Sequence, residues 1–259
     1  MTRRNFTLAA SGFAMMPPIS AANAGNAFLE LRRYDLRNTL DHEAQRTAEF
    51  LAHGAAPALE RAGAGPIGIF STAIGPGSPS CYLLISYPSF AAIETVREKL
   101  RHDGDYAKAL ESFDSAPGLA YQRMDSWLLR CFDGKPTVEP PPTEGRKAHR
   151  IFELRMYESN NRTTLARKIG MFNGGEIGIF ERLGMQPVFF GETLAGPKMP
   201  NLIYMLSFDD LAAREKLWGE FGSDPEWHKL SHTPGLSDPE IVSNINNLIL
   251  SPLAGSQIR

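Results

Sequence analysis

The chain has 259 residues, 42% of them hydrophobic, with 27 Lys and Arg against 29 Asp and Glu, which gives a formal net charge of −2. A slightly acidic chain argues against nucleic acid or an anionic membrane surface as its partner. Cys81 and Cys131 lack the CxxC and Cys/His spacings of redox and zinc sites. We expect two buried free thiols, with a disulfide bridge as the alternative.

The N-terminus has the pattern of an export signal. Arg3 and Arg4 precede a short apolar stretch over 8–19, and 22–24 offers a small-x-small cleavage site. This order predicts a twin-arginine signal over 1–24 and a periplasmic mature protein, with a disordered basic terminus as the alternative. Cleavage would remove two positive charges and leave 25 Lys and Arg against 29 Asp and Glu, a charge of −4. The apolar stretch is shorter than the roughly 20 residues that a bilayer crossing needs, so we expect no membrane insertion.

One sequence phrase occurs twice. Residues 28–34, FLELRRY, return as IFELRMY at 151–157, with Glu, Leu, Arg and Tyr at identical spacing 123 positions apart. A repeat that continues downstream, as this one does, indicates a duplicated domain. We therefore expect domains over 25–131 and 149–259, joined by the proline-rich segment 132–148 as a stiff extended linker.

Each copy predicts the same series of elements. Hydrophobic periodicity and turn signals give strand, helix, two strands, helix and strand. In the first copy the strands are expected at 27–36, 67–74, 81–87 and 121–131, and the helices at 40–62 and through Ile93, Val96 and Leu100. In the second copy the strands are expected at 151–158, 187–195, 202–208 and 241–251, and the helices at 162–183 and 209–221. This βαββαβ order is the ferredoxin-like arrangement, an α+β fold with both helices on one face of a four-stranded antiparallel sheet. The uncovered faces of the two sheets should then pack on each other.

The repeated strand carries the candidate site. Strand alternation places three polar side chains of each copy on one face: Glu30, Arg32 and Tyr34, and Glu153, Arg155 and Tyr157. Because the apolar residues between them suit the helix side, we expect the polar sets to point between the two sheets and line a ligand cleft. A carboxylate held in this way could accept a proton, and an arginine could hold an anionic group. The alternative is a structural ion-pair lattice that fixes the register of the sheet.

A second motif follows the second helix of each copy. Asp103 and Asp224 are expected to be helix N-caps. Tyr106 and Trp227 stand at equivalent places just after them. Both are candidate ligand-binding residues that could close the two ends of one cavity, with a role as core aromatics as the alternative.

We expect no metal and no other cofactor. His228 and His232 are four apart, a spacing that suits a metal or haem, but the first copy has no histidine at the matching positions and no further ligand stands nearby at a suitable spacing. Motifs of nucleotide-binding enzymes, serine hydrolases and zincins are absent from the sequence.

The ELRxY strands, the apolar strand at 201–208 followed by Arg214, and Asp-Pro-x-Trp at 224–227 resemble the NIPSNAP family within the dimeric α/β-barrel superfamily. The resemblance implies two tandem ferredoxin-like domains forming an internal barrel, but that family has no settled activity. The first copy departs from the pattern, with Ile93, Gly104 and Tyr106 at the places of the Arg, Pro and Trp.

Two functions stay open. One is an exported protein that binds, or also transforms, a small organic molecule of unknown identity between its sheets. The other is a non-catalytic scaffolding or protein-interaction module with a packed interior. A homo-oligomer is compatible with either, and the sequence leaves open whether the protein is an enzyme.

Overall fold

The computed structural model describes residues 25–40, 42–144 and 150–259; the predicted signal over 1–24 lies outside them. The first copy forms β1 (Phe28–Asp35), α1 (Glu43–Glu49), η1 (Phe50–Ala55), α2 (Ala56–Ala62), β2 (Ile67–Ile74), β3 (Ser80–Tyr87), α3 (Phe90–Arg101), α4 (Gly104–Asp114) and β4 (Arg123–Cys131). The second forms β5 (Ile151–Glu158), α5 (Arg162–Met171), η2 (Phe172–Glu176), α6 (Ile177–Arg182), β6 (Gln186–Ala195), β7 (Asn201–Phe208), α7 (Leu211–Gly222), α8 (Pro225–Ser231), α9 (Asp238–Ile241) and β8 (Asn244–Pro252).

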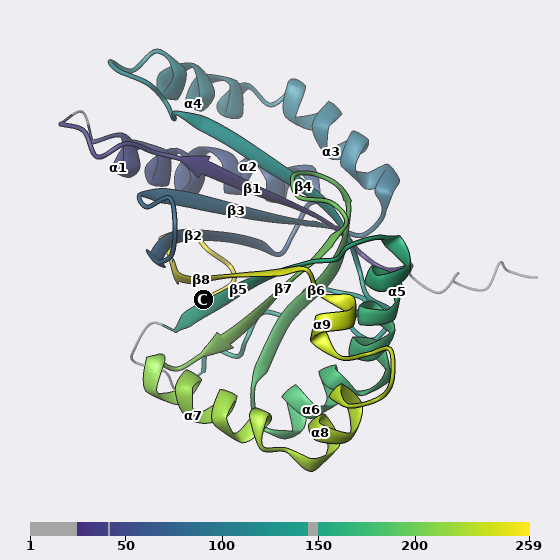
Figure 1. Ribbon diagram of the computed structural model, residues 1–259. Helices are drawn as coiled ribbons and strands as arrows, with labels where there is room; N and C mark the ends of the chain where they lie inside the picture. The colour runs from purple at the N-terminus through teal and green to yellow at the C-terminus, as the bar shows by residue number, and fades with distance from the viewer. Residues whose placement is uncertain (1–24, 41, 145–149) are drawn as a thin grey trace, which may run out of the picture.

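The two sheets close into one antiparallel barrel in the order β1-β3-β2-β8-β5-β7-β6-β4 (Figure 1). The order is circular, because β4 also pairs with β1. The first copy therefore supplies β4-β1-β3-β2 and the second β8-β5-β7-β6, and the two halves join where β2 pairs with β8 and β4 with β6. The predicted α+β fold of two ferredoxin-like halves packed sheet to sheet is confirmed. The seams add backbone hydrogen bonds, and closing the barrel leaves no sheet edge exposed.

Helices cover the outside of the barrel on opposite sides, α1 to α4 over the first sheet and α5 to α9 over the second (Figure 1). The predicted long helices 40–62 and 162–183 each contain a π-helical segment, η1 and η2. Such segments insert one residue per turn and are often found at functional sites. Here they lie at matching places in the two copies, so they belong to the duplicated unit.

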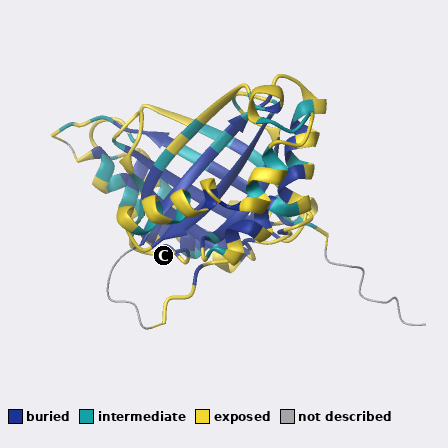
Figure 2. Ribbon diagram, turned by 60° about the horizontal axis from the view of Figure 1, so that its bottom comes forward, coloured by how far each residue is buried: buried dark blue, intermediate teal, exposed yellow. Residues whose placement is uncertain are grey.

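Both faces of the barrel wall are buried (Figure 2). One apolar cluster fills the barrel interior, and two others lie between the wall and the helices of each half. Val138 from the described part of the proline-rich segment and Ile258 from the C-terminus belong to the interior cluster. The segment of Val138 bonds to the backbone beside the starts of β1 and β6, at Ala27 and Val188, and that of Ile258 bonds to Ile67 at the start of β2. These strands start at the same end of the barrel, so the two side chains plug that end.

The cysteines lie in different layers. Cys81 packs on the helix side and Cys131 in the interior cluster, and both are buried and free. The expectation of free thiols is confirmed. Burial raises the pKa of each thiol to about 12, so neither is a reactive thiolate at neutral pH. Among the described residues, the helices lack the combination of length and hydropathy that a transmembrane span needs.

Candidate functional site

The Glu-Arg-Tyr sets face the helices, so the prediction that they point between the sheets is wrong. Tyr34 and Tyr157 belong to the two helix-side clusters, whereas Leu29, Leu31 and Leu154 fill the barrel interior. A closed barrel buries both faces of each strand, so an apolar set is no guide to the helix side. The polar set lies under the helices because helix side chains supply partners there, which a packed apolar interior cannot do.

In the second copy these residues form a network in which the carboxylate is satisfied, although the buried Arg155 Nε has no hydrogen-bond partner among the described residues. Glu153 is fully buried and accepts four hydrogen bonds, from Arg155 Nη1 at 2.7 Å, from Arg214 Nη2 and Nε at 2.7 and 2.9 Å, and from Trp218 Nε1 at 2.7 Å. Burial raises the pKa of Glu153, but the bonds from Arg214 and the charge of Arg155 outweigh it and the pKa is lowered. A carboxylate with all its acceptor sites used fits the structural alternative.

Tyr157 extends this network toward the core. Arg155 Nη2 donates to Tyr157 Oη at 2.9 Å, and Tyr204 donates to the same oxygen at 3.0 Å. The Arg155 guanidinium also lies over the Trp218 ring at 4.4 Å, a cation–π contact. Arg155 is therefore held both by hydrogen bonds to polar side chains and by the aromatic ring of Trp218.

The first copy is less complete. Glu30 accepts from Arg32 Nε at 2.7 Å, but its bonds from Tyr87 Oη and Ser126 Oγ are long, at 3.2 and 3.3 Å. Ile93 occupies the place that Arg214 has in the second copy. The two carboxylates thus differ in how fully their acceptor sites are used.

Tyr106 and Trp227 do not share a cavity. Tyr106 packs near Phe50 in the helical layer of the first half, and Trp227 stacks on Phe221 in the helical layer of the second, at 6.4 and 4.5 Å between ring centroids. The barrel separates the two layers. The caps are confirmed, since the Asp103 and Asp224 side chains each accept from two backbone N–H groups of the following helix.

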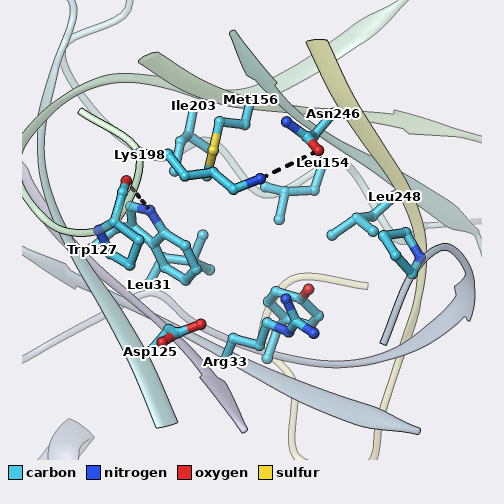
Figure 3. A pocket seen from close by; sticks show the side chains of 13 residues that line it. Leu31, Arg33, Asp125, Trp127, Leu154, Met156, Lys198, Ile203, Asn246 and Leu248 are labelled. Carbon is cyan, nitrogen blue, oxygen red and sulfur yellow. Dashed lines mark hydrogen bonds between the residues drawn. The ribbon is translucent and has the colours of Figure 1, made fainter. Parts of the chain in front are cut away.

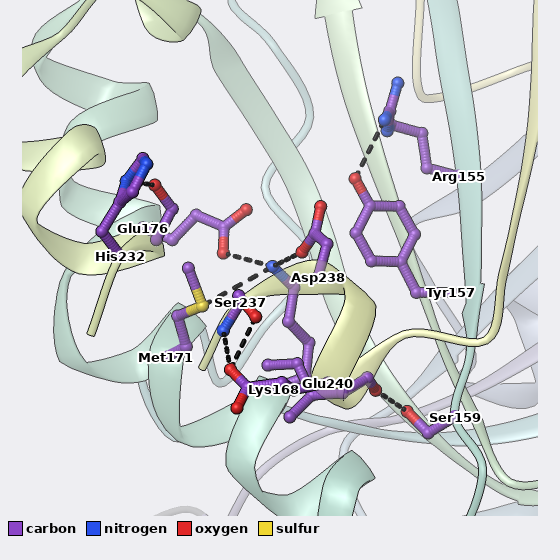
Figure 4. Close-up of polar contacts among 12 residues, drawn as sticks. Arg155, Tyr157, Ser159, Lys168, Met171, Glu176, His232, Ser237, Asp238 and Glu240 are labelled. Carbon is purple, nitrogen blue, oxygen red and sulfur yellow. Dashed lines mark hydrogen bonds and ion pairs between the residues drawn. The ribbon is translucent and has the colours of Figure 1, made fainter. Parts of the chain in front are cut away.

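A buried lysine in the second half was missed by sequence reasoning (Figure 4). Lys168 is fully buried; its Nζ lies 3.1 Å from Glu176 Oε2 and 3.4 Å from Asp238 Oδ1, and also contacts Met171 Sδ. Burial lowers its pKa, but Glu176 and Asp238 outweigh this and the pKa is raised. Its position among the apolar residues of 162–183, Leu165, Ile169 and Phe172, was the available signal.

His228 and His232 do lie on one helical face, with ring centroids 5.7 Å apart. His232 Nδ1 lies 2.8 Å from the His228 carbonyl oxygen, so that nitrogen already has a local partner. In the described parts of the chain, no group of three or more His, Cys, Asp and Glu side chains is arranged to hold a metal ion.

A pocket does lie between the two sheets, at the barrel mouth opposite the plugged end (Figure 3). Its volume is about 120 Å³, and both copies contribute. The wall is mainly apolar and consists of Leu31, Tyr82, Trp127, Leu154, Met156, Ile203 and Leu248. The rim is polar and consists of Arg33, Asp125, Lys198 and Asn246. We call this the mouth pocket.

The rim of the mouth pocket has two cations from opposite halves. Arg33 Nη2 pairs with Asp35 Oδ1 at 2.6 Å, while its buried Nε has no hydrogen-bond partner within the described chain. Lys198 Nζ lies 3.5 Å from Asn246 Oδ1 and 3.6 Å from Glu158 Oε1, both long contacts. An anionic group could therefore be held here without breaking a strong existing pair.

Strand alternation could have found part of this pocket, because Leu31 with Arg33 and Leu154 with Met156 share the face opposite the Glu-Arg-Tyr sets. Trp127, Lys198 and Asn246 gave no comparable signal. They come from other strands and a turn, and only the closed barrel brings them together.

The NIPSNAP family model matches residues 29–133 and 152–257, one match for each copy. A putative monooxygenase from Lactobacillus acidophilus NCFM is similar in structure, with a TM-score of 0.58 and 11% identity over 89% of this chain and 97% of that one. A putative monooxygenase from Fusobacterium nucleatum has a TM-score of 0.59 and 7% identity over 88% and 93%. A NIPSNAP family protein from Agrobacterium tumefaciens C58 covers 47% of this chain and 100% of its own, with 21% identity and a TM-score of 0.39. At these identities the similarity concerns the fold alone. Comparison with curated protein sequences gave no match.

Proposed function

This chain belongs to the NIPSNAP family, with one family domain in each copy, and from its barrel architecture we propose that it binds a small organic molecule in the mouth pocket. The observation that carries the proposal is the pocket itself: apolar walls from both sheets meet a polar rim in which the buried Arg33 Nε has no hydrogen-bond partner among the described residues. Concave apolar sites with a few polar groups are the usual form of small-molecule sites.

The pocket's size and its excess of rim cations, Arg33 and Lys198 against the one carboxylate Asp125, favour an aromatic carboxylate as the ligand. Its volume of about 120 Å³ is somewhat below the roughly 150 Å³ of an engineered apolar cavity that holds benzene in another protein. A single ring could pack against Trp127 and Leu154, with a carboxylate extending to the rim near Arg33 and Lys198. Tyr82 lines the same pocket, and burial raises its pKa to about 12. Tyr82 therefore stays protonated at neutral pH and can donate a hydrogen bond to the bound carboxylate.

The scaffolding alternative also has an observation in its favour. Below the mouth the interior is filled by side chains such as Phe70 and Phe152, whose rings lie 5.1 Å apart. A larger ligand could not enter without repacking this core. A suitable probe is therefore a molecule small enough to bind in the mouth pocket without displacing these side chains.

Benzoate is the probe, and the two arginines that pair with Asp35 provide the comparison. Arg33 lines the mouth pocket, whereas Arg123 Nε pairs with the same carboxylate at 3.0 Å but does not line it. We expect Arg33→Met to weaken benzoate binding at least about tenfold, since a charge-assisted hydrogen bond is lost. Arg123→Met should change it less than about twofold, because an exposed arginine outside the pocket makes no such contact.

The measurement is an NMR titration that follows the indole N–H signal of Trp127, which donates to the Pro197 carbonyl at 3.2 Å beside the pocket. Thermal unfolding of both variants shows that they remain folded. Absence of a benzoate-dependent shift, or equal weakening by the two substitutions, would refute the proposal and favour the scaffolding alternative. Native mass spectrometry of the protein purified from its own cells would show whether a small molecule is retained.

We also propose that residues 1–24 direct export by the twin-arginine route, on the support of the paired arginines and the cleavage pattern. The periplasmic protein should begin at Gly25 in an intact-mass measurement. Replacing Arg3 and Arg4 together by lysine should keep the chain in the cytoplasm, because the export machinery reads the arginine pair. Unchanged export of that variant would contradict the proposal.

A further inference from the structure

A second pocket lies on the helix side of the first sheet and is separate from the mouth pocket. Its volume is about 260 Å³, and α3, β1 and β4 form it. Its lining residues include Glu30, Phe90, Ile93, Arg97, Ser126 and Leu128. Leu128 and its neighbour Trp127 point to opposite faces of β4, so the barrel wall separates this α3 pocket from the mouth pocket.

The second copy fills the matching space with its own side chains. At the shift of 121 positions that relates α3 to α7, Ile93 corresponds to Arg214 and Arg97 to Trp218. In the second copy both side chains reach the strand and donate to Glu153. In the first copy an isoleucine cannot donate, and an arginine that stays exposed leaves the space open.

Glu30 is consequently the less satisfied of two equivalent carboxylates. It is only 7% exposed, and of its three hydrogen bonds one is short, at 2.7 Å from Arg32, while those from Tyr87 and Ser126 are 3.2 and 3.3 Å long. A carboxylate offers about four acceptor positions. Glu30 therefore has acceptor capacity left and faces an open pocket.

The filled copy shows which chemistry fits the open one. Trp218 places an indole N–H 2.7 Å from Glu153 Oε2, while the Arg155 guanidinium stacks 4.4 Å from its ring. Arg32 is the counterpart of Arg155 and Glu30 that of Glu153. We propose that the α3 pocket binds a planar aromatic molecule of the indole class, which donates its ring N–H to Glu30 as the Trp218 indole does to Glu153.

The charges around Glu30 favour a neutral ligand over a cation. Arg32 already pairs with the carboxylate, and the positive charge of Arg97 lies close enough to act on it. Glu94 also lines the pocket, but its charge is paired with Arg101 at 2.6 Å. Arg97 makes no hydrogen bond or ion pair with any described residue and is exposed, so it can turn aside or cover the outer face of a bound ring. Ile93, Leu128 and the 59% exposed Phe90 provide the apolar contacts.

The probe is indole, and 1-methylindole is its matched analogue without the N–H donor. Isothermal titration of the full mature chain should show indole binding, and 1-methylindole should bind at least about tenfold more weakly, because a buried carboxylate loses its donor. Equal affinity for the two compounds would overturn the assignment of Glu30 as the acceptor. Absence of indole binding would overturn the proposal as a whole.

Arg97→Trp makes the first copy like the second and should fill the pocket, so indole binding should be lost while thermal stability is kept or raised. Thr95→Trp is the matched control, because it adds the same side chain on the exposed opposite face of α3. Arg33→Met at the mouth pocket should leave indole affinity unchanged, which separates this site from the proposed benzoate site. Indole affinity that survives Arg97→Trp, or that falls equally with Thr95→Trp, would contradict the proposal.

Discussion

Replacing Lys168 by methionine should destabilise the protein by about 3–5 kcal/mol, because it leaves a buried carboxylate without its partner. Lys168 and Glu176 are both fully enclosed, with side chains 1% and 2% exposed. Asp238, the other partner, is 47% exposed and can turn to water. Urea unfolding at pH 7 gives the change in free energy, provided that the dependence on denaturant is unchanged.

The double variant Lys168→Met/Glu176→Leu is the decisive control. Replacing both members of a buried ion pair by apolar residues of similar volume is often neutral or stabilising, so the double variant should recover most of the loss. If it is as unstable as the single variant, the loss comes from packing and the ion-pair explanation is wrong.

The loss in Lys168→Met should also depend on pH. Burial raises the pKa of Glu176 above its ordinary value of 4.5, and removing the ammonium takes away the charge that opposes this effect. Below about pH 4.5 the carboxyl is protonated in both the folded and the unfolded variant, so no ionisation penalty exists. As the pH rises above that value the unfolded state ionises first, and the variant should become progressively less stable.

Replacing Glu153 by glutamine should cost a similar amount, about 3–5 kcal/mol, because Arg155 and Arg214 then lose their shared counter-ion. Glutamine keeps the shape of the side chain but has one acceptor oxygen and two new N–H donors, which face donors. Chemical denaturation followed by circular dichroism measures the loss.

Glu158→Gln on the same strand is the matched control for Glu153→Gln. The Glu158 side chain is 23% exposed, and Lys198 is 3.6 Å away. We expect less than about 1 kcal/mol there, since partly exposed pairs contribute little. Equal losses of stability at the two positions would mean that the buried network around Glu153 contributes no more to folding than the partly exposed contacts of Glu158.

The parent protein should show the matching pH dependence. The pKa of Glu153 in the folded state is lowered from 4.5, so the unfolded state binds the proton more readily. Its contribution to stability is present above about pH 4.5 and is lost as the pH falls through the folded-state pKa. Glu153→Gln lacks this contribution, so its stability should differ least from the parent's at low pH.

The duplicated unit and the order of its elements follow from short-range patterns in the sequence. The repeated phrase at 28–34 and 151–157, and local signals such as the Asp103 and Asp224 caps, depend on residues close in the chain. Local periodicity therefore predicted the strands, the ferredoxin-like halves and their packing sheet to sheet. These features are readable because the alternation of side chains is fixed by the backbone.

Which face of each strand points into the barrel and which faces the helices depends on tertiary contacts. Strand alternation separates Glu30 from Leu31, but it does not say which side faces the interior when both sides are buried. The decision came from partners on α7, such as Arg214 and Trp218, more than 60 positions from Glu153. The same holds for Lys168 and Asp238, which are 70 positions apart. The mouth pocket and the α3 pocket likewise depend on closure of the barrel and on helices laid across it, because their walls come from segments that only folding brings together.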